Sequence, residues 1–149
     1  MTDKTDAPGA AWSALARLAR TGQARIDNVL AAEGLPAEEF LPLLEELAAA
    51  PSQTGVTAKS LEGTLGLPQY AVSRLLGRAI KAGLVTRAPH PQDKRSTLVM
   101  ATEDARRLYP RMARARDAAI DAFFADRLRP GQVKRLNDLL QMMEDSADE

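Results

Sequence analysis

Residues 66–87, GLPQYAVSRLLGRAIKAGLVTR, decide the fold of this chain. A short helix capped by Thr57 ends at the first glycine of this stretch, and the proline begins a second helix that ends at Gly83. Two short helices joined by a glycine-containing turn are typical of a helix-turn-helix. Residues 84–87 and 96–100, LVTR and STLVM, are rich in β-forming side chains and enclose a polar loop, which predicts a β-hairpin. The sequence therefore predicts a helix-turn-helix that runs directly into a hairpin.

Amphipathic helices are predicted on both sides of this segment. Apolar residues recur at three- and four-residue steps over residues 11–33, and another helix begins at Pro36. Downstream, a long helix begins at Thr102 and contains Pro110, where we expect a kink or, alternatively, the meeting of two separate helices. A last helix follows Pro130. The predicted fold class is mainly α, with a small β-hairpin.

These elements divide the chain into three predicted parts. Residues 1–10 are expected to form a flexible tail, and residues 51–101 a winged helix-turn-helix domain. Residues 11–50 and 102–145 are expected to form a helical dimerisation region. The terminal helices have more apolar surface than a winged helix needs for its own core, and pairing them in a homodimer would bury the excess.

Charge is unevenly distributed along a chain whose net charge is zero. Residues 27–50 include six acidic residues and no basic one, whereas residues 67–97 include six basic residues and one acidic residue. From residue 117 onwards, eight acidic residues outnumber four basic ones. A basic centre between acidic flanks favours a nucleic-acid-binding segment. The alternative is chance clustering of charges on solvated faces.

The composition excludes or disfavours several other classes of protein. The chain has 149 residues with no cysteine and one histidine, so thiol chemistry is excluded, and a multi-histidine metal site or a Ser–His dyad is disfavoured. The sequence has no glycine-rich phosphate loop, metal-ligand cluster or base–nucleophile pair, and we expect neither enzymatic activity nor a cofactor or metal. It has no signal peptide or membrane-spanning stretch, so we expect a cytoplasmic protein without a membrane partner.

Residues 66–87 and 91–108 resemble the MarR family of bacterial transcriptional regulators. The matching motifs are Val72-Ser73-Arg74-Leu75 in the second short helix, Gly83-Leu84-Val85 at its junction with the first strand, and Asp93-Lys94-Arg95-Ser96 at the hairpin tip. Residues 34–48 also have the form of the family's second helix, and the likeness extends from about residue 11 to residue 145. The resemblance implies a winged helix-turn-helix fold in which the hairpin is the wing.

The sequence departs from the family pattern at the start of the second short helix. Pro68 stands where the family commonly has a capping serine, and Gln69 and Tyr70 stand where it commonly has small residues. Proline cannot cap a helix with its side chain, but its fixed φ suits a helix start. The fold is expected to tolerate these changes, while the base preference is left open.

The resemblance implies that the second short helix enters the major groove of DNA with its N-terminus first, while the wing reaches the minor groove. The residues expected to contact DNA are Gln69, Tyr70, Ser73, Arg74, Arg78, Lys81, Lys94 and Arg95, with Asp93 orienting Arg95. Glutamine can pair with adenine and arginine with guanine, and tyrosine can touch a sugar or a thymine methyl. Arg78, Lys81 and Lys94 suit phosphates. For Arg74 and Arg95 the alternative is a surface ion pair.

The resemblance also implies the partners of the protein. A two-fold symmetric homodimer implies a pseudo-palindromic operator in double-stranded DNA, with half-sites ~10 bp apart. Members of the family commonly respond to small aromatic or lipophilic acids, and Trp12, Arg17, Phe40 and Tyr109 could line such an effector pocket. Trp12 and Phe40 could equally be core residues.

The function implied by the resemblance is a dimeric, sequence-specific DNA-binding transcriptional regulator, namely a repressor relieved by a small-molecule effector. The alternative is a winged-helix protein-interaction module without DNA binding, in which the basic hairpin docks an acidic partner. Duplex binding whose affinity falls steeply with salt would distinguish the first function from the second.

Overall fold

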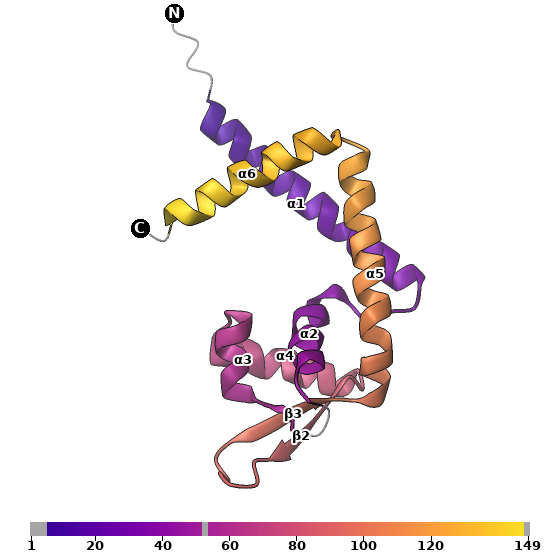
Figure 1. Ribbon diagram of the computed structural model, residues 1–149, viewed down its shortest axis with the longest axis vertical. Coiled ribbons are helices and arrows are strands. Elements are labelled where there is room, and N and C mark those ends of the chain that lie inside the picture. The colour runs from indigo at the N-terminus through magenta and orange to yellow at the C-terminus, as the bar shows by residue number, and fades with distance from the viewer. Residues whose placement is uncertain (1–5, 52–53, 148–149) are drawn as a thin grey trace, which may run out of the picture. The chain divides into compact units, whose positions relative to one another are not determined.

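The computed structural model describes residues 6–51 and 54–147. In chain order its elements are α1 (Ala7–Ala32), the 3-10 helix η1 (Glu38–Phe40), α2 (Leu41–Ala49), β1 (Val56–Thr57), α3 (Ala58–Leu65), α4 (Gln69–Lys81), β2 (Val85–Pro89), β3 (Thr97–Ala101), α5 (Glu103–Ala125) and α6 (Pro130–Ala147) (Figure 1). The predicted fold class, mainly helical with a small β-hairpin, is confirmed. No helix in the described part of the chain is long and apolar enough to cross a membrane.

The chain divides into two compact units. The central unit is Asp27–Arg116, and the terminal unit consists of the residues up to Ile26 together with those from Asp117 onwards. This division differs from the predicted one because α2 packs against α3 and β3 and so belongs with the helix-turn-helix. Residues 1–5 of the predicted tail lie outside the described residues, and α1 already begins at Ala7.

The core of the central unit is built by apolar faces with helical spacing. In α4, Val72, Leu75, Leu76 and Ala79 recur at three- and four-residue steps, and all four are buried. Helix α4 packs against α3 and β2. The other fully buried side chains of the unit include Leu43, Leu44, Leu47, Leu61, Leu84, Val99 and Met112. Since one face of α4 is committed to this core, its opposite face is left exposed.

The sheet has three antiparallel strands in the order β1-β3-β2. The predicted hairpin is present, although β2 and β3 are each shifted slightly toward the C-terminus, with Val85 opposite Ala101 and Pro89 opposite Thr97. Sequence reasoning missed β1, whose two residues pair with β3 through Val56 opposite Val99. Thr57 then caps α3, because its side-chain oxygen accepts a hydrogen bond from the Ser60 amide at 3.1 Å, as predicted.

Thr102 joins the end of α4 to the start of α5. Its hydroxyl donates to the Gly83 carbonyl at 2.8 Å and accepts from the Ala105 amide at 3.1 Å, while its own amide donates to the Leu84 carbonyl at 2.9 Å. The helix that begins here continues through Pro110 without a break. The alternative of two separate helices at the proline is therefore wrong, and the kink stays a prediction.

The terminal unit has little core of its own. None of the residues of α6 is buried, and large apolar side chains are exposed on both terminal helices, namely Trp12, Leu15, Leu18, Leu139, Met142 and Met143. An ion pair links α1 to the residue that follows α5, and a cation–π contact lies next to it. Arg25 Nη1 donates to Asp126 Oδ2 at 2.8 Å, and the Arg127 guanidinium lies 4.0 Å from the Phe123 ring centroid.

Candidate nucleic-acid interface

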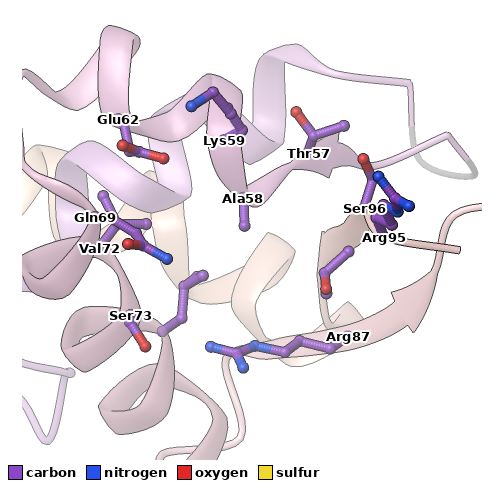
Figure 2. Close-up of a pocket in the computed structure, with 12 residues that line it drawn as sticks. Thr57, Ala58, Lys59, Glu62, Gln69, Val72, Ser73, Arg87, Arg95 and Ser96 are labelled. Atoms are coloured by element: carbon purple, nitrogen blue, oxygen red, sulfur yellow. The ribbon is translucent and has the colours of Figure 1, made fainter. Parts of the chain in front are cut away.

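A cavity of about 440 Å³ lies between α3, α4 and the wing, which is formed by β2, β3 and their connecting loop (Figure 2). Three cationic side chains line it: Lys59 from α3, Arg87 from β2 and Arg95 from the wing loop. The other polar lining residues are Thr57, Glu62, Gln69, Ser73, Ser96 and Thr97, and the apolar ones are Ala58, Val72 and Leu76. We call this feature the basic cavity, because three cations and only one carboxylate line it.

The turn between α3 and α4 brings the start of α4 to the edge of the basic cavity. Gly66 ends α3 with a φ of +63°, a backbone conformation that residues with a Cβ rarely adopt. Pro68 precedes α4 without a side-chain cap, and its carbonyl accepts hydrogen bonds from the amides of Ala71 and Val72 at 3.0 and 3.1 Å. Proline therefore begins this helix by its backbone geometry alone, and Gln69 and Ser73 line the cavity from α4.

Tyr70 and Arg74 lie together on the exposed face of α4. The tyrosine side chain is 66% exposed, and the Arg74 Cζ lies 5.8 Å from the centroid of its ring. A guanidinium at this distance from an aromatic face forms a cation–π contact. In the described structure Arg74 thus contacts a ring and does not form the surface ion pair that was its alternative. The base contact expected of Arg74 stays a prediction.

Asp93 organises the tip of the wing by accepting three hydrogen bonds. Its Oδ1 accepts from the Arg95 amide at 3.0 Å, its Oδ2 accepts from the Ser96 hydroxyl at 3.1 Å, and its carbonyl accepts from the Ser96 amide at 3.0 Å. The aspartate therefore positions Arg95 by its backbone, in an Asx-type turn, and not by pairing with the guanidinium. The Arg95 side chain is exposed at the edge of the basic cavity.

Arg78 has a partner within the protein. Its Nε donates to Glu39 Oε1 at 3.2 Å, and its Nη2 donates to Glu39 Oε2 at 2.9 Å. Arg78 is on α4 and Glu39 on η1, so this two-bond ion pair joins the second half of α4 to the segment before α2. The sequence predicted a phosphate contact for Arg78 and did not predict this ion pair. Lys81 and Lys94, the other predicted phosphate contacts, are exposed.

Sequence reasoning did not single out two cations of the basic cavity. Lys59 is near the start of α3, and Arg87 lies opposite Val99 in the sheet. Figure 2 shows the Arg87 side chain extending from β2 toward Ser73 on α4. Arg87 was part of the basic segment of the sequence, but only the packing of β2 beside α4 brings it into the cavity. Glu62, the one carboxylate here, was not predicted either.

The residues predicted for an effector pocket are divided between the two units. Trp12 and Arg17 belong to the terminal unit, and Phe40 and Tyr109 belong to the central unit. Phe40 is only 6% exposed and is a core residue, as the alternative held, whereas Trp12 is 73% exposed and is not. None of the four lines the basic cavity. The effector pocket therefore stays a prediction.

A model of the MarR family matches residues 34–96, from the end of α1 to the wing loop. The fold is similar to that of the PcaV transcriptional regulator from Streptomyces coelicolor, with a TM-score of 0.80 and 20% identity, covering 95% of this chain and 97% of that one. It is also similar to Sco3205, a MarR family transcriptional regulator from Streptomyces coelicolor solved in complex with DNA, with a TM-score of 0.75 and 22% identity over 93% of this chain and 86% of that one.

A third solved structure is CouR from Rhodococcus jostii RHA1 bound to p-coumaroyl-CoA, with a TM-score of 0.61 and 27% identity over 87% of each chain. No curated protein sequence matches the chain. The family match covers the helix-turn-helix and the wing loop, and the structural likeness extends over nearly all of the chain. The resemblance inferred from the wing and recognition-helix motifs is thus confirmed, and residues 34–96 of the chain match the MarR family.

Proposed function

We propose that the protein is a dimeric transcriptional regulator that binds double-stranded DNA sequence-specifically through α4 and the wing. The observation that carries the proposal is the basic cavity, where three cations line the space between α3, α4 and the wing. Duplex DNA supplies phosphates for such cations, and its major groove, about 12 Å wide, admits an α-helix. The DNA complex of the structurally similar Sco3205 supports this assignment.

Each part of the interface has a distinct role in this proposal. With the N-terminus of α4 in the major groove, Gln69 and Arg74 read base edges and Tyr70 touches a sugar or a thymine methyl. Arg95, at the wing, enters the minor groove, where the negative potential attracts a guanidinium. Lys59 and Arg87, inside the basic cavity, bind the phosphates of the strand that passes between α4 and the wing.

The terminal unit supports a homodimer. Exposed apolar side chains on α1 and α6, together with the absence of any buried residue in α6, leave an apolar surface that a second copy would cover. Two copies related by a two-fold axis would bind a pseudo-palindromic operator with half-sites ~10 bp apart.

Leu139→Asp, which puts a charge at an exposed apolar position of α6, should give a monomer at micromolar concentration in light scattering. Gln141→Asp, which adds the same charge at an exposed polar position of that helix, should stay dimeric.

The proposal includes regulation by a small molecule and no enzymatic activity. The similar CouR is bound to p-coumaroyl-CoA, which supports an aromatic or lipophilic effector here. Such an effector would relieve repression by binding near the predicted residues Trp12, Arg17, Phe40 and Tyr109. Arg17→Ala should then weaken effector binding without changing the affinity for DNA in its absence.

The experiment that tests DNA binding is selection from a pool of random duplexes. The protein should enrich a pseudo-palindromic sequence, and log affinity for that sequence should fall linearly with log salt, with a slope of about −0.9 for each phosphate bound. A protein-interaction module would enrich no sequence, and that outcome would refute the proposal.

A further inference from the structure

Arg78 is a cation on the exposed side of α4, and its guanidinium is engaged in an ion pair with Glu39. Both hydrogen bonds of the pair are formed, and the side chains are 51% and 44% exposed. Two parallel N–H···O bonds from guanidinium to carboxylate match the way in which arginine binds the oxygens of a phosphate. Glu39 therefore holds the donors of Arg78 that a phosphate would otherwise use.

The position of Arg78 along α4 places it within reach of DNA phosphates. It is nine residues beyond Gln69, which corresponds to about 13 Å along the axis of an α-helix. Since the major groove is only about 8.5 Å deep, a helix that enters it with its N-terminus first has Arg78 near the rim of the groove. The phosphates line this rim, and one of them can compete with Glu39 for the guanidinium.

We propose that Glu39 is a specificity-setting residue that restrains Arg78 and so keeps the sequence-independent affinity of the protein for DNA low. The inference rests on the proposed function, because it concerns phosphates met by α4 in a duplex. A phosphate contact strengthens binding to every sequence equally and adds one to the counterions released. While Glu39 holds Arg78, that contact is absent, and recognition depends more on the base-reading residues at the start of α4.

Glu39 also connects this restraint to another part of the central unit. It lies in η1, next to Phe40, whose ring is buried in the core. The backbone that carries Glu39 is therefore anchored to the core by its neighbour, just before α2. Any rearrangement that shifts η1 would release Arg78 and raise the affinity for DNA.

The test is a double-mutant cycle of Glu39→Gln and Arg78→Ala, measured on a random-sequence duplex of about 20 bp, two helical turns. Glu39→Gln should bind more tightly than the wild type. Its affinity should also fall about 3.5-fold more between about 50 and 200 mM salt, the effect of one added phosphate contact. Arg78→Ala alone should keep the salt slope of the wild type. The double variant should lose the gain made by Glu39→Gln, because the released guanidinium is absent.

The control is Glu45→Gln, which removes one negative charge from the exposed surface of α2. An equal increase in affinity and slope for this control would overturn the inference, because it would show a general charge effect. A shallower salt slope for Arg78→Ala alone would also overturn it, since Arg78 would then bind phosphate in the presence of Glu39. If the folded wild type bound no duplex at any salt concentration, the proposed function would fail, and the inference with it.

Discussion

Tyr70 and Arg74 form a cation–π pair on the exposed face of α4, with the Arg74 Cζ 5.8 Å from the ring centroid. They are four residues apart, which places them on the same side of the helix. A guanidinium held against a ring has fewer rotamers to give up when it binds a base, so binding costs less conformational entropy. The pair thus prepares the arginine for a directed contact.

Arg74→Ala should weaken binding to the selected operator by about 1–3 kcal/mol and relax the preference at one position of each half-site. The reason is the loss of a bidentate contact to a guanine edge. Binding to a set of operators that differ at single positions measures both effects. Tyr70→Leu should have a smaller effect, about 0.5–1 kcal/mol, because it removes the ring that restrains Arg74 but leaves an apolar side chain that can still touch a sugar or a thymine methyl. Uniform weakening on all sequences by Arg74→Ala would identify a phosphate contact instead.

Asp93→Ala should lower DNA affinity about as much as Arg95→Ala does, although Asp93 carries the wrong charge to bind DNA. It provides the acceptor oxygens for the Arg95 amide and the Ser96 hydroxyl, and without them the wing tip loses its shape. Both variants should bind with reduced preference for A·T-rich flanks, where the minor groove is narrow. Asp93→Asn keeps one side-chain oxygen as an acceptor and should retain more affinity than Asp93→Ala. An increase in affinity for Asp93→Ala would mean that charge repulsion outweighs the role of Asp93 in the turn.

The local elements of the fold could be predicted because their signals are within a few residues of one another. The spacing of Val72, Leu75 and Leu76 defines the buried face of α4, and Thr102 marks the start of α5. Strand β1 has no such signal. Two residues are too few for a periodic pattern, and they form a strand only because Val56 pairs with Val99, far along the chain.

The candidate site could be predicted only where its residues lie on one element. Tyr70 and Arg74 follow from the helical repeat, but the pairing of Arg78 with Glu39 joins residues 39 positions apart and has no pattern in the sequence. The same holds for Lys59, which lines the basic cavity together with Arg87 because the packing of α3 and the sheet places it there. Contacts of this kind depend on the tertiary fold.

Gly55→Ala and Gly77→Ala should change stability in opposite directions. Gly55 has a φ of +60°, and a Cβ there would lie 2.8 Å from both the Val99 carbonyl oxygen and Met100 Cγ. We expect a loss of about 2 kcal/mol or more from backbone strain and this clash. Gly77 is within α4, and a Cβ there would meet no atom within 4 Å, so alanine should stabilise the helix by about 0.5–1 kcal/mol. Urea unfolding of both variants measures the two effects, and destabilisation by Gly77→Ala would contradict the open surface at that position.

The Arg25–Asp126 ion pair predicts a pH-dependent contribution to the stability of the terminal unit. The hydrogen bond from Arg25, followed by its positive charge, lowers the pKa of Asp126 below the ordinary value of 3.8. A carboxylate whose pKa is lower in the folded state than in the unfolded state stabilises the fold above the unfolded pKa, and this contribution is lost as the pH falls through the folded pKa.

Arg25→Ala should therefore raise the pKa of Asp126 toward 3.8 in a carboxyl-detected NMR titration. The stability difference between this variant and the wild type should be constant near neutral pH and should shrink below about pH 4. Arg20→Ala, which removes a charge from an exposed position of the same helix, should leave the Asp126 titration unchanged, and an equal shift in that variant would show that long-range charge, and not the hydrogen bond, sets the pKa of Asp126.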